Sequence, residues 1–141
     1  MADTIRKIDY FAMSIPDKPG EGHRILAALA REGVNLLAVS GFPAGRGRAQ
    51  LDLVPEDVAG FTRAAARAKL RTRKAKGAFL VQSDSDRAGA VAGLLERLAA
   101  KKIPVTAAQA LSAGAGRWAM ILWVKPARWA KACEALGVPR G

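Results

Sequence analysis

The residues whose types and spacing suit the binding of a small charged ligand lie in one short stretch near the N-terminus: Asp17, Lys18, Pro19, Gly20, Glu21 and Gly22. Gly20 has no Cβ, so its backbone can approach a ligand closely, and the first turn of the helix predicted behind it presents free N–H groups that favour a carboxylate. Asp17 or backbone carbonyls can neutralise an ammonium group, while Pro19 narrows the loop and lowers the cost of ordering it. An α-amino acid, which carries both charged groups, fits such a loop.

This stretch belongs to an internal repeat. Ser14 to Gly20 recurs as Ser83 to Gly89, 69 residues later, and the same offset relates Leu29 to Leu98, Gly45 to Gly114 and Leu53 to Leu122. Self-similarity at a fixed period is the signature of a duplicated supersecondary unit. The second copy of the loop is formed by Asp86, Arg87, Ala88 and Gly89.

The period of the apolar residues changes in the same order within each copy. In the first copy it predicts a strand over 7–15, a helix before a Gly33 cap, strands over 34–42 and 49–53 (the latter half-exposed), a helix over 55–68 and a short strand over 70–75. In the second copy it predicts a strand over 78–83, a helix over 86–100, strands over 103–111 and 117–124, and a helix over 126–136.

This order predicts an α+β fold, a ferredoxin-like βαββαβ sandwich in two tandem copies, with repeat 1 over 1–76 and repeat 2 over 77–141. Only residues 137–141 remain where the second copy needs its fourth strand. We therefore expect that last strand to be truncated or missing, with the sheet edge left open or completed by another segment.

Both faces of the strand from Arg117 to Val124 are apolar, whereas a sheet with one solvated face should alternate apolar and polar residues. The second face is covered either by the sister repeat or by a second chain, and an open sheet edge favours pairing between chains. We expect a homodimer. The alternative is that Trp118 and Trp123 lie in an enlarged core within one chain.

With its motifs Asp17-Lys-Pro-Gly20 and Gly33-Val-Asn35, the chain resembles two tandem ACT domains with no catalytic domain attached. The ACT domain is a small regulatory module that binds amino acids, so the resemblance implies amino-acid binding at an interface between domains. In that family, the asparagine matching Asn35 hydrogen-bonds the ligand across the interface, and the candidate ligand-binding set therefore also includes Asn35 and Leu36. The alternative role for Asn35 is that of a turn residue after Gly33.

The second copy departs from this pattern. Its loop keeps the acid, the base and the glycine but has Ala88 in place of the proline, and Pro104 stands at the position of Asn35. Proline offers neither an amide side chain nor an N–H. We therefore expect a weaker site in the second copy, and a first-copy loop that faces a partner surface.

The sequence offers little for catalysis, metal binding or membrane insertion. One histidine, His23, and one cysteine, Cys133, cannot supply the usual metal ligands, and no nucleophile motif is present. We expect no catalytic residue, metal or cofactor, an exposed His23 and a buried Cys133. No apolar run approaches the length of about 20 residues that a spanning helix needs, and the N-terminus lacks the apolar region of a signal peptide. A cytoplasmic protein is expected.

Two alternatives to ligand binding stay open. The net charge of +11 and the seven basic residues within 63–76 would suit nucleic acid, although the predicted strand over 48–54 has no aromatic residue on which bases could stack. A structural adaptor without a ligand would explain the loss of the proline and asparagine in the second copy. The sequence favours a non-enzymatic regulatory protein that binds an amino acid and acts on an enzyme or another protein.

Overall fold

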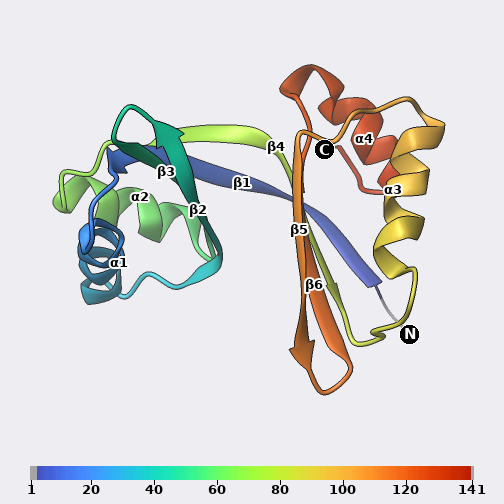
Figure 1. The fold of residues 1–141 in the computed structure, drawn as a ribbon, viewed down its shortest axis with the longest axis horizontal. Coiled ribbons are helices and arrows are strands. Elements are labelled where there is room, and N and C mark those ends of the chain that lie inside the picture. Colours follow the sequence, from blue (N-terminus) through green and yellow to red (C-terminus); the bar gives the residue numbers. More distant parts are fainter. Residues whose placement is uncertain (1–2, 141) are drawn as a thin grey trace. The chain divides into compact units, whose positions relative to one another are not determined.

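Six strands and four α-helices form residues 3–140, the part of the chain that the computed structural model describes (Figure 1). In chain order the elements are β1 (Asp3–Pro16), α1 (Glu21–Arg31), β2 (Leu36–Gly45), β3 (Arg48–Pro55), α2 (Val58–Arg67), β4 (Arg73–Ser83), α3 (Ala90–Ala100), β5 (Ala107–Gly114), β6 (Arg117–Trp123), the 3₁₀-helix η1 (Pro126–Arg128) and α4 (Trp129–Leu136).

Residues 9–75 form one compact unit with the strand order β2-β3-β1-β4, which is that of a ferredoxin-like sheet. β1 and β3 run antiparallel, with Pro16 opposite Arg48. Alternate residues of β1 point toward the helices, because successive side chains of a strand point to opposite faces. The core of this unit comprises Phe11, Met13, Ile15, Ile25, Leu29, Leu51, Leu53, Phe61, Ala64 and Ala65.

The second unit consists of residues 76–140 together with residues 3–8. Its strand order is β5-β6-β4-β1, so the N-terminal part of β1 provides the fourth strand that the second copy lacks in its own sequence. Ile5 packs against the core of this unit, which includes Phe79, Leu98 and Leu122. The ferredoxin-like fold is confirmed, and the sheet edge of the second copy is completed by another segment. The predicted repeats, 1–76 and 77–141, follow the sequence duplication, whereas the compact units assign residues 3–8 to the second.

Several element boundaries differ from prediction. β1 begins at Asp3 rather than residue 7, because it extends into the second unit. α3 begins at Ala90 rather than residue 86, because Gly89 is left-handed, with φ 85°, and ends the loop before the helix. The predicted strand over 103–111 is shifted to Ala107–Gly114, opposite β6.

The prediction of a half-exposed third strand is wrong. β3 is buried from Leu51 to Pro55, and Asp52 is only 6% exposed. This carboxylate lies between two neighbouring strands, opposite Ala12 and Ser40, and accepts a hydrogen bond of 2.8 Å from Gln50. Burial is the main reason that the pKa of Asp52 lies above its ordinary value.

The two tryptophans of β6 are buried. Trp118 belongs to the core of the unit formed by residues 3–8 and 76–140, and its indole N–H donates to the Ser85 carbonyl at 3.1 Å. Trp118 therefore lies in a core within one chain, which is the alternative stated above to a contact between two chains. Among the described residues, no helix has the length and apolar character needed to cross a membrane.

Candidate functional site

The first loop, residues 17–20, is exposed and is held by its backbone. The Asp17 N–H donates to the Gly47 carbonyl at 2.8 Å, and the Glu21 N–H donates to the Lys18 carbonyl at 3.3 Å. Gly20 has φ 91°, a left-handed conformation that favours glycine, and precedes α1 without a side-chain cap. A Cβ placed on Gly20 would meet no atom within 4 Å. Glycine is therefore favoured at position 20 by the left-handed backbone conformation and not by a lack of space for a side chain within this chain.

The second loop, residues 86–89, repeats this geometry at the same offset of 69 residues. The Asp86 N–H donates to the Gly116 carbonyl at 3.0 Å, and the Ala90 N–H donates to the Arg87 carbonyl at 3.4 Å. Gly89 has φ 85° and precedes α3 without a side-chain cap. The loop with Ala88 in place of the proline thus keeps these two backbone hydrogen bonds and the left-handed glycine.

A groove of about 400 Å³ opens beside the second loop. Asp86, Arg87 and Gly89 form one wall together with the first turn of α3, while Ala110, Leu111 and Ser112 of β5 form the other. A groove of about 250 Å³ lies near the first loop, but its described lining contains none of residues 17–22. The larger groove therefore accompanies the loop that the sequence ranks as weaker.

Asn35 and Leu36 lie far from the first loop within their own unit. Leu36 pairs with Pro55 and Asn35 contacts Glu56, through the Glu56 N–H to the Asn35 carbonyl at 3.0 Å, whereas Pro16 pairs with Arg48 at the other end of β3. Eight residues of strand separate these ends by about 23 Å. The structure groups Asp17, Lys18, Pro19, Gly20, Glu21 and Gly22 at one end, and Asn35 and Leu36 at the other.

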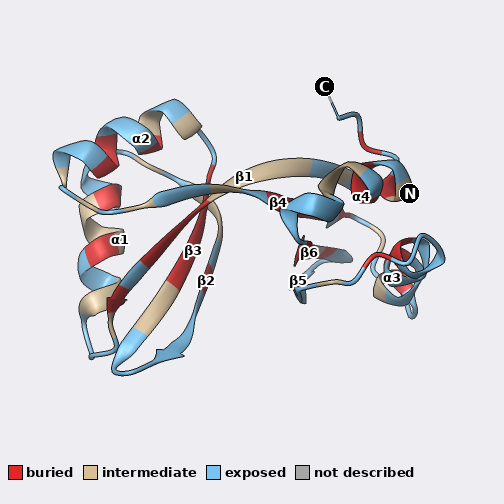
Figure 2. Ribbon diagram, turned by 90° about the horizontal axis from the view of Figure 1, so that it is seen from above, coloured by how far each residue is buried: buried red, intermediate tan, exposed pale blue. Residues whose placement is uncertain are grey.

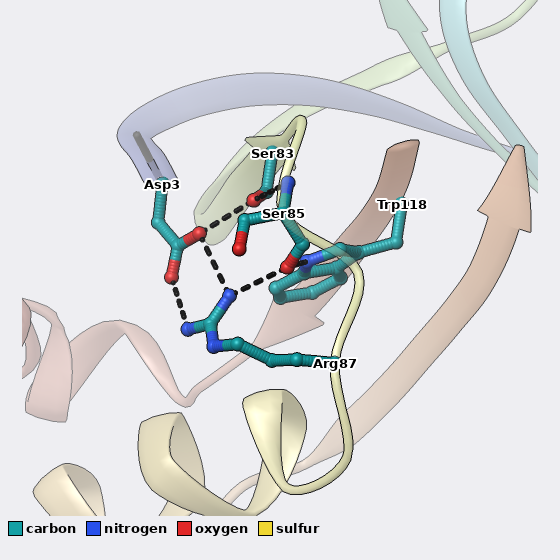
Figure 3. A network of polar contacts seen from close by, with 5 residues as sticks. All are labelled: Asp3, Ser83, Ser85, Arg87 and Trp118. Carbon is teal, nitrogen blue, oxygen red and sulfur yellow. Dashed lines mark hydrogen bonds and ion pairs between the residues drawn. The ribbon is translucent and has the colours of Figure 1, made fainter. Parts of the chain in front are cut away.

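A polar network anchors the second loop to the N-terminal strand (Figure 3). The Arg87 guanidinium pairs with Asp3 Oδ2 at 2.8 Å and donates to the Ser85 carbonyl at 2.7 Å. The buried Ser83 hydroxyl donates to Asp3 Oδ1 at 2.5 Å and accepts from the Ser85 N–H at 3.0 Å. The hydrogen bonds from Arg87 and then from Ser83 hold the pKa of Asp3 below its ordinary value.

We expect Asp3→Asn to destabilise the protein by about 1–2 kcal/mol at pH 7, because the amide keeps the shape but loses the charge-assisted bonds. A carboxyl whose folded pKa is depressed stabilises the fold above its unfolded pKa of about 4, and this contribution disappears as pH falls through the folded pKa. Urea unfolding of both proteins at pH 7 and at about pH 2.5, below that unfolded pKa, measures the difference. A stability gap that is equally large at both pH values would contradict this role.

Asp3 is a residue that the sequence motifs did not single out. Within residues 3–8 only Ile5 and Ile8 are apolar, so no apolar alternation marks this segment as a strand. The signal in the sequence is the missing fourth strand of the second copy, which requires another segment to complete the sheet.

His23 is exposed, as expected. Cys133 is fully buried in the core, also as expected, and desolvation raises the pKa of its thiol. The basic segment over 63–76 is partly neutralised, since Arg67 pairs with Glu32 at 2.8 Å and Lys74 pairs with Asp9 at 3.5 Å.

Known structures share this fold across nearly the whole chain. A protein from Bacteroides thetaiotaomicron is 16% identical, with a TM-score of 0.78, over 93% of this chain and 87% of that one. The regulatory subunit of aspartate kinase from Thermus thermophilus is 16% identical, with a TM-score of 0.64, over 96% and 94% of the two chains. The regulatory subunit from Thermus flavus is 14% identical, with a TM-score of 0.61, over 97% and 95%. No protein-family model and no curated protein matches the sequence. The structural matches confirm the ACT-like fold.

Proposed function

We propose that this chain is a cytoplasmic, non-enzymatic regulatory protein that binds an amino acid at its glycine loops and thereby changes its association with a partner enzyme or other protein. The observation that carries this proposal is the repetition of the loop backbone. Two glycines, Gly20 and Gly89, take the same left-handed conformation before helices that have no side-chain cap, in a fold shared with aspartate kinase regulatory subunits. The first N–H of each helix donates to the Lys18 or Arg87 carbonyl, and the N–H groups that follow it in the first turn favour a carboxylate.

The second loop supports an amino acid with a small or apolar side chain. Its groove joins the uncapped start of α3 to Asp86, an exposed carboxylate suited to an ammonium group, and to Ala110 and Leu111 on β5. A carboxylate, an ammonium group and a side chain would thus each meet a complementary surface. The binding residues proposed for this loop are Asp86, Arg87, Ala88 and Gly89, alongside those of the first loop.

We propose that the first loop completes its site across an interface. Because Asn35 lies about 23 Å from that loop within its own unit, it can contact the same ligand only from another copy or domain. A homodimer supplies such a surface. β2 and β5 contain no charged residue, and β2 exposes Val39 and Phe42 while β5 exposes Leu111. Uncharged strands without protecting lysines favour pairing between chains.

A ligand bound at such an interface regulates by coupling. It stabilises one arrangement of the subunits only by the difference between its affinities for the two arrangements. The regulated partner would bind one of the two arrangements more tightly than the other.

The test is a thermal-shift screen of the protein against the twenty amino acids. A true ligand at about 100 times its Kd stabilises the fold by about 2.7 kcal/mol, which for this size corresponds to a rise in Tm of about 10 °C. Gly20→Val and Gly89→Val, made separately, should each reduce the ligand-induced rise in Tm. In each variant a branched side chain projects over the amides of the first helical turn and weakens binding at that loop.

Gly137→Val is the matched control for backbone strain. Gly137 also has positive φ, 72°, an added Cβ there would meet the Arg97 guanidinium at an ordinary contact distance of 3.5 Å, and it lies beyond the end of α4, away from the proposed binding residues. This variant should lower Tm by about as much as Gly20→Val, through a strain of about 1–2 kcal/mol, while keeping the ligand-induced shift. If no amino acid raises Tm, or if both loop variants respond like the parent protein, the proposal fails.

A further inference from the structure

A basic groove of about 250 Å³ lies in the unit of residues 9–75, and residues 17–22 do not line it. Its floor is apolar, formed by Met13, Ile15, Ile25 and Leu70. Three cationic side chains line it: Arg24 from α1, and Lys69 and Arg71 from the connection between α2 and β4. The described lining includes no acidic residue. Positive charge above an apolar floor suits a molecule with one anionic group and one apolar or neutral part.

Lys69 occupies an unusual backbone position. It follows the end of α2 with φ 56°, and its N–H donates to the Ala66 carbonyl at 3.1 Å. A residue with a Cβ is disfavoured in this left-handed conformation, which usually selects glycine at a helix end. The corresponding helix end in the other unit has Gly137, with φ 72°. Lys69 therefore carries a backbone strain that glycine would relieve, and its side chain lines the groove.

The charges of the groove are only partly compensated. Arg24 pairs with Glu21 at 3.0 Å on the exposed surface of α1. Within the described residues, neither Lys69 nor Arg71 forms an ion pair, unlike the nearby Arg67 and Lys74. Because these two cations have no acidic partner on the groove lining, their charges are available to an anionic ligand.

We propose that this groove binds a small phosphorylated molecule, with the phosphate held by Arg24, Lys69 and Arg71. Arginine matches phosphate through two parallel N–H bonds, and lysine adds a point charge. The groove volume suits one small molecule rather than an extended strand, and its apolar floor faces the part of the ligand that lacks the phosphate. This site goes beyond the proposed amino-acid function and uses none of the proposed loop residues.

The test is isothermal titration calorimetry with adenosine monophosphate, using adenosine and inorganic phosphate as comparison probes. Adenosine monophosphate should bind, adenosine should not, and inorganic phosphate should compete. Lys69→Gly should weaken binding about tenfold or more, because a charge-assisted bond is lost. The same substitution should raise Tm, since glycine relieves the left-handed strain, so weaker binding cannot be ascribed to unfolding. Arg71→Gln should weaken binding similarly.

Lys102→Gly is the matched control. Lys102 follows the end of α3 with φ 57°, and its N–H donates to the Ala99 carbonyl at 2.9 Å, so this variant also loses one positive charge and one strained residue. It should raise Tm and leave adenosine monophosphate binding unchanged. Equal weakening in both lysine variants would overturn the proposal, because overall charge would then explain the binding. Salt-sensitive binding of a short single-stranded RNA, without binding of adenosine monophosphate, would also overturn it. The response to amino acids should persist in Lys69→Gly, which separates this test from that of the proposed function.

Discussion

Gly77→Ala is expected to destabilise the protein by about 3 kcal/mol or more, because a Cβ at this position has no room. Gly77 has φ 105°, and an added Cβ would lie 2.5 Å from the Val124 carbonyl oxygen. The two backbones cannot separate easily, because the Val124 N–H donates to the Gly77 carbonyl at 2.7 Å. Relief of the clash would therefore break a buried hydrogen bond. Urea unfolding followed by tryptophan fluorescence measures the loss.

The control for Gly77→Ala is Gly93→Ala. Gly93 lies within α3, and a Cβ placed there meets nothing within 4 Å. Alanine is favoured over glycine inside a helix, so this variant should be about 0.5–1 kcal/mol more stable than the parent. If Gly77→Ala unfolded at the same urea concentration as the parent, the close approach of Gly77 and Val124 would be wrong.

Deleting residues 1–8 is expected to destabilise the unit of residues 76–140 by about 3–5 kcal/mol while leaving residues 9–75 folded. The deletion removes the strand beside β4, the packing of Ile5, and the carboxylate that binds Ser83 and Arg87. A half-buried isoleucine contributes about 1–2 kcal/mol, and a buried hydroxyl without its partner costs about 1–3 kcal/mol. The exposed backbone of β4 adds to this loss.

Amide hydrogen exchange localises the effect of the deletion. Phe79, Val81 and Leu122 should lose protection, because they belong to the core that Ile5 covers, whereas Leu53 and Phe61 should keep it. A synthetic peptide of residues 1–8, added in trans, should restore part of the protection. Uniform loss of protection across both sets, with no response to the peptide, would contradict a strand segment that serves only the second unit.

Burial patterns explain why so much of the fold could be predicted. Ile25 and Leu29 lie one helical turn apart and are both buried, and Gly33 has the positive φ expected of a residue beyond a helix end. The two loops repeat their hydrogen bonds as they repeat their residues. Figure 2 shows buried segments interspersed with exposed ones along α1 and α2, as expected of helices with one face on a core.

The prediction for β3 failed because the alternation of apolar and polar residues within one strand does not show which other strands pair with it. Gln50 and Asp52 are polar, and a strand with polar residues at alternate positions normally has one solvated face. Asp52 is nevertheless buried, because β1, which is distant in the sequence, and β2 flank it on either side, and Gln50 donates a hydrogen bond to its carboxylate.

The sequence by itself determined the duplication, the glycine loops and the order of strands and helices, except that the strands predicted over 70–75 and 78–83 form the single strand β4. Helices, strands and turns follow from patterns over short stretches of chain, and the duplication follows from comparing one stretch with another. Only the tertiary structure decided that residues 3–8 complete the second unit, that Asp3 anchors the second loop, and that Asn35 lies at the far end of β3 from the first loop. These features depend on which distant strands pair, and pairing is selected by the burial and hydrogen bonding of the whole sheet rather than by any local pattern.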